Sequence, residues 1–111
     1  MPPRSRIDLL QGTLDLLVLR TLLPGPMHGW AISERIQQIS QDVLRVNQGS
    51  LYPALHRLEN QGWICAQWEE SDLERVAKVY SLTTQGRKQL ERELRTWRRL
   101  SSGVHLLIEN A

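Results

Sequence analysis

The sequence predicts a mainly α-helical fold with one small β-hairpin, and three observations lead to this prediction. Apolar residues, above all leucine, recur at helical spacing in several separate stretches. Two short stretches late in the chain alternate residues that face inward and outward, as half-buried strands do. The chain has 111 residues, which suits a single domain whose core buries about 65% of the unfolded surface.

The first predicted helix spans Asp8–Leu23 and carries leucines on more than one face. Leu10, Leu14 and Leu17 form one stripe, and a second stripe runs along another face. A surface helix of a monomer normally buries one face. Two apolar faces therefore indicate two partners, the helix's own domain and a second subunit. The Pro-Gly-Pro run that follows ends this helix.

A second helix is predicted over His28–Ile39, where apolar residues again lie near helical spacing. Asp42–Val46 is predicted to be a short extended segment that leads to the next helix. We interpret Trp30, Trp63 and Trp68 as core or domain-packing residues.

The most informative segment is Gly49–Ile64, which reads G-S-L-Y-P-A-L-H-R-L-E-N-Q-G-W-I. Leu51, Leu55 and Leu58 define one apolar helical face, and Gly62 suits the C′ position that ends a helix. The other faces combine hydrogen-bonding groups, an aromatic ring and a positive charge. This combination suits a helix in a DNA major groove, although an ordinary solvated face is the alternative at this point.

Pro53 constrains where this helix begins, because proline is costly in a helix interior but harmless in the first turn. Ser50 as the N-cap would place Pro53 in the first turn, whereas Asn47 would place it in the second. We therefore expect Ser50 to be the N-cap. In either case, residues beside the N-terminus lie where backbone amides and the helix dipole attract phosphate.

Two strands are predicted downstream, over Ile64–Glu69 and Ala77–Leu82, with the polar segment Glu70–Val76 as the tip of a hairpin. A recognition-like helix followed by a hairpin is the winged helix-turn-helix plan. Thr83 or Thr84 can cap the helix that follows.

The last predicted helix runs from about Thr84 to Ile108, and its apolar residues follow a coiled-coil-like spacing. The residues of this stripe are Leu90, Leu94, Trp97, Leu100, Val104 and Leu107. We interpret the stripe as a dimerisation surface, with a helix folded back on its own domain as the alternative. The expected organisation is a winged helix-turn-helix domain over 1–83, whose first helix contributes to the dimer, and a C-terminal dimerisation helix over 84–111.

Three segments, M-H-G-W-A-I, G-S-L-Y-P-A-L-H-R-L-E-N-Q-G-W-I and K-V-Y-S-L-T-T-Q-G, have the order and spacing found in PadR-type transcriptional regulators. The chain resembles this family from about Leu10 to the last helix. The resemblance implies a small dimeric bacterial repressor. The wing departs from the family's Arg-rich pattern, since it reads E-R-V-A-K-V-Y with acidic residues nearby, which puts its share of DNA affinity in doubt.

We therefore hypothesise that the protein is a repressor that binds a pseudo-palindromic operator as a homodimer. The residues expected at the DNA are Gln48, Gly49, Ser50, Tyr52, Pro53, His56 and Arg57 on the helix and Arg75 and Lys78 on the wing. In some regulators of this kind, a tryptophan matching Trp97 lines a pocket at the dimer centre and stacks on flat aromatic ligands. The resemblance therefore implies a small aromatic or hydrophobic effector at Trp97, with Leu10 and Leu14 beside it, or plain interface packing.

Other classes of function find little support in the sequence. The three histidines and the lone Cys65 lack metal-ligand spacing, and neither a phosphate-binding glycine loop nor a hydrolase elbow is present. We therefore expect no enzyme activity, no metal and no cofactor. The lone cysteine and the lack of a signal-peptide pattern predict a cytoplasmic protein. A net charge of +2 is only mildly basic, so non-specific binding of nucleic acid would need that charge concentrated on one surface. A winged-helix module that binds protein instead of DNA is the alternative.

Overall fold

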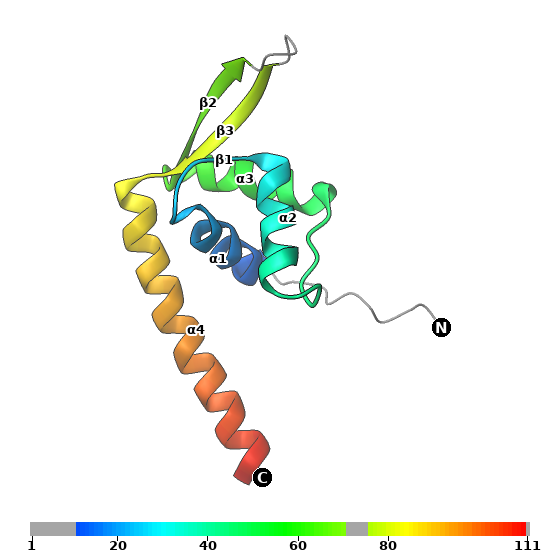
Figure 1. Ribbon diagram of the computed structural model, residues 1–111. Coiled ribbons are helices and arrows are strands. Elements are labelled where there is room, and N and C mark those ends of the chain that lie inside the picture. The colour runs from blue at the N-terminus through cyan, green and yellow to red at the C-terminus, as the bar shows by residue number, and fades with distance from the viewer. Residues whose placement is uncertain (1–10, 71–75, 111) are drawn as a thin grey trace.

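The computed structural model describes residues 11–70 and 76–110. Three short helices pack around one core beside a small sheet, and a long fourth helix leads away from them (Figure 1). The helices are α1 (Gln11–Leu22), α2 (Gly29–Ile39), α3 (Gln48–Asn60) and α4 (Thr84–Asn110). The strands are β1 (Met27–His28), β2 (Ile64–Glu70) and β3 (Val76–Leu82).

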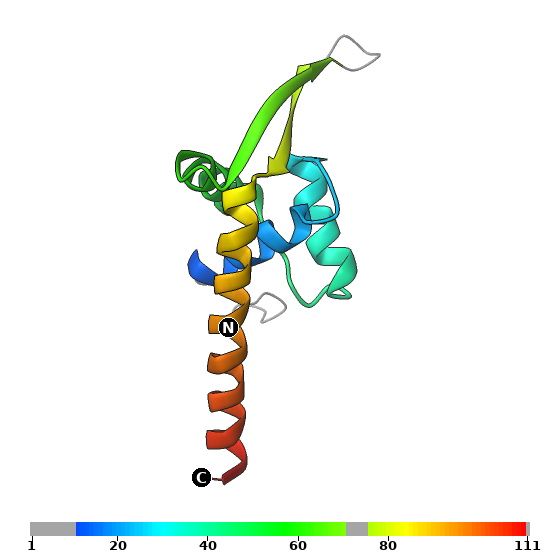
Figure 2. The ribbon, with the colours of Figure 1, turned by 90° about the vertical axis from the view of Figure 1, so that its left-hand side faces the viewer.

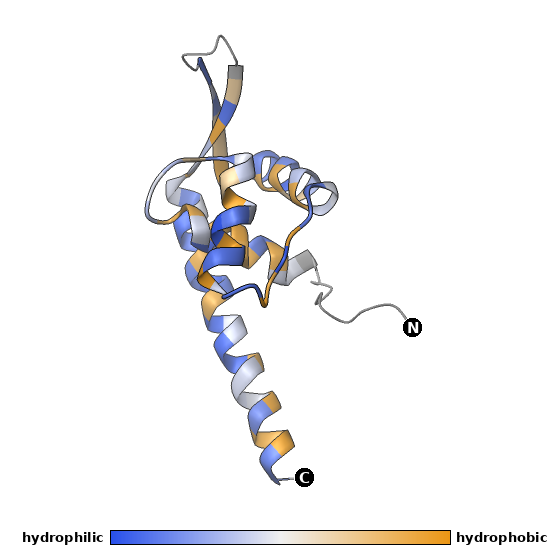
Figure 3. Ribbon diagram, turned by 45° about the vertical axis from the view of Figure 1, so that its right-hand side comes forward, coloured by the Kyte–Doolittle hydropathy of each residue, from blue (hydrophilic) through white to orange (hydrophobic). Residues whose placement is uncertain are grey.

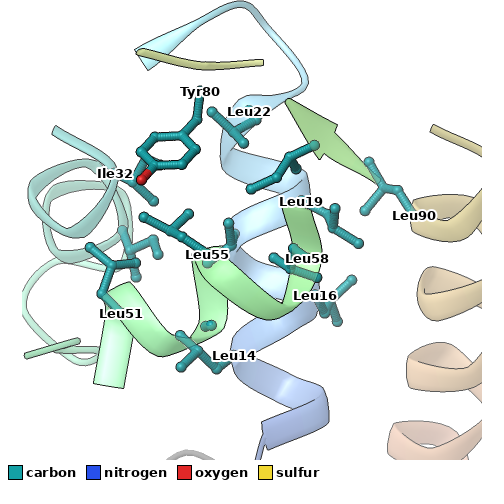
Figure 4. Close-up of a cluster of buried hydrophobic side chains, with 14 residues drawn as sticks. Leu14, Leu16, Leu19, Leu22, Ile32, Leu51, Leu55, Leu58, Tyr80 and Leu90 are labelled. Atoms are coloured by element: carbon teal, nitrogen blue, oxygen red, sulfur yellow. The ribbon is translucent and has the colours of Figure 1, made fainter. Parts of the chain in front are cut away.

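Helix α1 is the centre of the core, and the chain's own domain buries most of the apolar residues that the structure describes on it. It contacts α2, α3, α4 and β3, and Val18, Leu19 and Leu22 are at most 1% exposed. Leu14 and Leu16 are also buried, and Figure 4 shows them in the same cluster as the leucines of α3. Leu17 and Leu23, one from each predicted stripe, are only partly buried. The chain's own domain therefore covers much of both faces, and the contribution of this helix to a dimer stays a prediction.

The core face of α3 agrees with the predicted period. Leu51, Leu55 and Leu58 are at most 1% exposed and point into the cluster drawn in Figure 4. At the end of the helix, Gly62 adopts a φ of 77°, and the amide of Trp63 donates to the carbonyl of Leu58 at 3.1 Å. This closing pattern confirms Gly62 as the glycine after the helix.

The predicted start of α3 was wrong, since Asn47 and not Ser50 is the N-cap. The Asn47 Oδ1 atom accepts a hydrogen bond from the Ser50 amide at 2.8 Å, and its carbonyl accepts from the Leu51 amide at 3.0 Å. Pro53 consequently lies inside the helix, beyond its first turn. The cap satisfies a backbone donor at the N-terminus, which offsets part of the cost of the hydrogen bond that Pro53 cannot donate.

The hairpin is found close to its predicted bounds, and a third strand joins it. The sheet order is β1-β3-β2, with both pairings antiparallel. His28 pairs with Val79 in this sheet, although the sequence pattern had placed it in the second helix. Two residues are too short a strand to show an alternating pattern, so only the pairing with β3 reveals β1.

Helix α4 begins on the domain and then leaves it. The Thr83 hydroxyl accepts from the Gly86 amide at 3.0 Å and donates to the Gly62 carbonyl at 2.7 Å, which confirms a threonine cap. Leu90 is 3% exposed and Leu94 packs against the same core, so both belong to the chain's own domain instead of starting the dimerisation stripe. The second half of the helix projects past the other elements (Figure 2). Within the described residues, no helix is long and apolar enough to span a membrane.

Candidate nucleic-acid interface

The outward face of α3 is polar and nearly uncharged. Gln48, Gly49, Ser50, Pro53 and His56 are exposed. Tyr52 keeps 42% of its surface exposed, and Asn60 extends the same face toward the end of the helix. Among the expected contacts on α3, these residues lie together on one surface that is free of the core. A face with donors, acceptors and an aromatic ring has the chemistry that reads base edges in a major groove.

The side chain of Arg57 is 37% exposed and is held by an ion pair with α1. Its guanidinium Nη2 atom donates to Asp15 Oδ1 of α1 at 2.7 Å, and its Nε atom is buried without a hydrogen-bond partner among the described residues. Burial raises the pKa of the Asp15 carboxyl above its usual 3.8. The positive charge of Arg57 lowers this pKa in part, and the negative charge of Glu93 raises it slightly further. The structure therefore shows Arg57 in an ion pair between α3 and α1. Its role in reading or anchoring the DNA stays a prediction.

This geometry predicts a structural effect for Arg57→Ala. Removing the guanidinium leaves the partly buried Asp15 carboxylate without its partner, so the free energy of unfolding at pH 7 should fall by about 1–2 kcal/mol. Because the folded pKa of Asp15 is raised, the folded state holds this proton more tightly than the unfolded chain. The stability from this group is therefore greatest below pH 3.8 and is lost as the pH rises through the folded pKa.

Urea unfolding at pH 7 and pH 4.5 checks the prediction. The loss caused by Arg57→Ala should shrink at the lower pH and in an Asp15→Asn background. Arg45→Ala, at an exposed arginine, is the control and should change stability little. An Arg57→Ala protein as stable as the parent, with weakened discrimination between DNA sequences, would contradict the structural role and favour a DNA contact by Arg57.

Tyr52 joins the face of α3 to the start of α2. A Cβ atom on Gly29 would come within 3.0 Å of Tyr52 Cε1 and 3.1 Å of its hydroxyl oxygen, so the ring rests directly against the glycine backbone. This contact explains why glycine follows His28 in the M-H-G-W segment. It also fixes Tyr52 at the boundary between α3 and the sheet.

A hollow of about 370 Å³ opens beside Tyr52, between the start of α2 and the base of the hairpin. His28, Trp30, Trp68 and Lys78 line it. Trp30 is 53% exposed and Trp68 is 68% exposed, so the prediction that these two tryptophans pack in the core was wrong. Trp63 is partly buried and does pack against the core. The regular spacing of apolar residues continues along both segments past the point where other elements of the domain cover them. Spacing alone therefore predicted burial for Trp30 and Trp68.

Within the described residues, Lys78 is the hairpin residue that was expected to contact DNA phosphate. Its Nζ atom lies 5.3 Å from the centre of the Trp68 ring, a cation–π arrangement. Glu69 and Glu70 are exposed on the neighbouring strand, so acidic charge does accompany the wing. Arg75, the other expected phosphate contact, lies outside the described residues.

Trp97 lies on α4 beside α1, next to a second hollow of about 220 Å³. The ring is 45% exposed, and Gly12, Thr13 and Leu16 form the α1 side of the hollow. Leu14 is 6% exposed in the core and does not line this hollow, because its side chain points to the other side of α1; Leu10 lies outside the described residues. Among the described residues, no group of three or more His, Cys, Asp or Glu side chains could hold a metal ion.

The helices and the three-stranded sheet with its protruding hairpin define a winged-helix protein. The chain belongs to the transcriptional regulator PadR-like family, whose model matches residues 18–92. This family consists of transcriptional regulators, which sets the chain apart from enzymes.

Two curated relatives extend the comparison. The chain is 37% identical over 94 residues to a transcriptional regulator of Mycobacterium tuberculosis, a match that covers 85% of this chain and 84% of that protein. It is also 43% identical over 90 residues to an uncharacterized 37.1 kDa protein in a transposon of Streptomyces fradiae. That match covers 81% of this chain but only 24% of the larger protein, so the chain spans about a quarter of its length.

Solved structures share the fold over most of the chain. A PadR family transcriptional regulator from Eggerthella lenta superposes with a TM-score of 0.77 at 30% identity, covering 91% of this chain and 86% of that one. A PadR-like transcriptional regulator from Bacillus cereus gives a TM-score of 0.76 at 26% identity, covering 92% and 97%. These similarities confirm the winged-helix architecture that the sequence predicted.

Proposed function

We propose that this protein is a sequence-specific DNA-binding repressor that acts as a homodimer on a pseudo-palindromic operator. The observation that carries the proposal is the exposed, uncharged polar face of α3 in a chain of the PadR-like family. Tyr52 and His56 are the side chains best placed to contact bases, and Lys78 supplies a cation for the backbone. Such a regulator works where the chromosome lies, in the cytoplasm.

A gel-shift experiment with the DNA upstream of the protein's own gene tests this proposal. Tyr52→Ala and His56→Ala should each weaken binding to that duplex by about 1–3 kcal/mol and leave binding to a random duplex of equal length almost unchanged. Gln61→Ala, an exposed residue just past α3, is the matched control. A parent protein that binds no duplex would favour the alternative, a winged-helix module that binds protein.

The homodimer is supported by the far half of α4. Leu100, Val104, Leu107 and Ile108 are between 45% and 71% exposed, and Figure 3 shows apolar bands on these turns with no other element beside them. Burial of one such side chain contributes about 1.5–3 kcal/mol. Two copies of this surface can therefore offset an association cost of about 4–15 kcal/mol.

We also propose that a small effector binds beside Trp97 and controls DNA binding. The hollow beside Trp97 is open in the single chain, and a two-fold axis near α4 would bring two of them close together. A flat aromatic or hydrophobic ligand bound there would alter the angle between subunits and hence the distance between the two α3 helices. Altered spacing would release the operator.

Fluorescence titration with planar aromatic compounds tests the effector. The parent should be quenched, and Trp97→Ala should be quenched much less while it remains dimeric and binds DNA. Trp30→Ala removes another exposed tryptophan and is the control for lost emission. If Trp97→Ala keeps full ligand affinity, the effector pocket lies elsewhere; if it fails to dimerise, Trp97 is an interface residue.

A further inference from the structure

The hollow at the base of the wing has aromatic walls that the proposed contacts of α3 do not use. The His28 and Trp30 rings are stacked, with their centres 6.0 Å apart and their planes 11° from parallel. Across from them, Trp68 and Lys78 face each other in register on β2 and β3. Large aromatic side chains that remain exposed in a group of this kind mark a binding surface more often than scattered apolar residues do.

The position of Trp68 follows from the register of the hairpin. The pairs Ile64–Leu82 and Ala66–Tyr80 lie on one face of the hairpin, where Ile64 and Tyr80 are buried, and Trp68–Lys78 is the next pair outward on that face. The face that covers the core thus continues past the helices. An apolar ring and a cation stand there with no element of the described chain over them.

The charge of the hollow favours an anion. Among the described residues that line the hollow, Lys78 carries a formal positive charge and none is a carboxylate. Burial raises the pKa of the Tyr80 hydroxyl, with Glu59 adding to the shift, so this lining group stays a neutral donor. Helix α2 begins at Gly29, which also lines the hollow, and its N-cap His28 makes no side-chain capping bond.

The hollow is continuous with the DNA-facing side of α3, because Tyr52 belongs to both. We propose that it holds one sugar-phosphate unit of the DNA strand that borders the groove occupied by α3. The deoxyribose packs on Trp30 and Trp68, and Lys78 meets the phosphate. This inference rests on the proposed function, and it identifies Trp30 and Trp68 as contacts with the backbone instead of the bases.

The test measures the affinity of Trp30→Ala, Trp68→Ala and Lys78→Ala for the upstream duplex and for a random duplex of the same length. Each tryptophan variant should lose about three- to tenfold on both duplexes alike. Lys78→Ala should also lower the slope of log affinity against log salt by about 1. Ile39→Ala, at an exposed apolar residue at the far end of α2, is the control and should match the parent.

A second measurement changes the DNA and locates the phosphate that Lys78 contacts. Single phosphates of the upstream duplex are replaced by neutral methylphosphonates, and one position should weaken the parent but not Lys78→Ala. If the parent binds DNA and both tryptophan variants retain its affinity, the inference is overturned while the proposed function stands. Losses confined to the upstream duplex would also overturn it, since they would indicate base reading. A parent that binds neither duplex would overturn both.

Discussion

Val104→Asp should convert the protein to a monomer and reduce its affinity for the operator about 100-fold or more. The substitution places a carboxylate in the apolar surface that two α4 helices are proposed to share, where its desolvation is costly. Two half-sites joined in one dimer bind with a high effective concentration, and a monomer loses that gain. Val104 is the cleaner position for this test than Leu94, because Leu94 packs against the chain's own core.

Sedimentation and gel-shift measurements on the same samples check the result. Val43→Asp introduces the same charge at another valine, 54% exposed in the loop before α3, and should remain dimeric. A Val104→Asp protein that sediments as a dimer would contradict the assignment of α4. A monomer that binds the operator as tightly as the parent would contradict the need for dimerisation.

Gly86→Ala should strongly destabilise the folded protein. A Cβ atom at this position would overlap the backbone carbonyl of Trp63 and would lie 2.8 Å from Leu82 Cδ1. The backbone of Trp63 cannot rotate away from the added methyl group as a side chain could. Helix α4 would therefore have to shift from its contact with the core. We expect the free energy of unfolding to fall by about 3 kcal/mol, and the melting temperature to fall by roughly 10 °C or more.

Gly103→Ala supplies the matched comparison within the same helix. Apart from its chain neighbours and the adjacent helix backbone, no atom of the described residues lies within 4 Å of a Cβ atom placed at Gly103. Alanine should therefore raise stability by about 0.5–1 kcal/mol. Thermal unfolding followed by circular dichroism, at one fixed protein concentration, measures both changes. A Gly86→Ala protein that melts with the parent would show that α4 does not start against Trp63.

The sequence predicted the helices and the hairpin because each depends on a local period. Leu51, Leu55 and Leu58 mark the buried side of α3 by spacing alone, and burial at every one of them confirms it. The start of α3 was misjudged because proline in the first turn is only a preference. The bond from the Ser50 amide to Asn47 Oδ1 decided the cap.

The candidate site was less predictable, because a period shows which side of an element is apolar but not what covers it. Trp30 and Trp68 follow the pattern of their elements and yet lie past the edge of the core. Arg57 has the charge expected of a DNA contact, but its partner Asp15 is 42 residues away in the sequence. Such a pairing emerges only when α1 and α3 are packed together.

Two copies of α3 are proposed to read one operator with two-fold symmetry. Selection of the parent protein against a library of random DNA duplexes tests it most directly. The selected sequences should contain an inverted repeat whose half-site centres lie about one helical turn apart, roughly 10 base pairs. A library that remains random after selection, or a single unrepeated site bound by one copy of the chain, would contradict the claim.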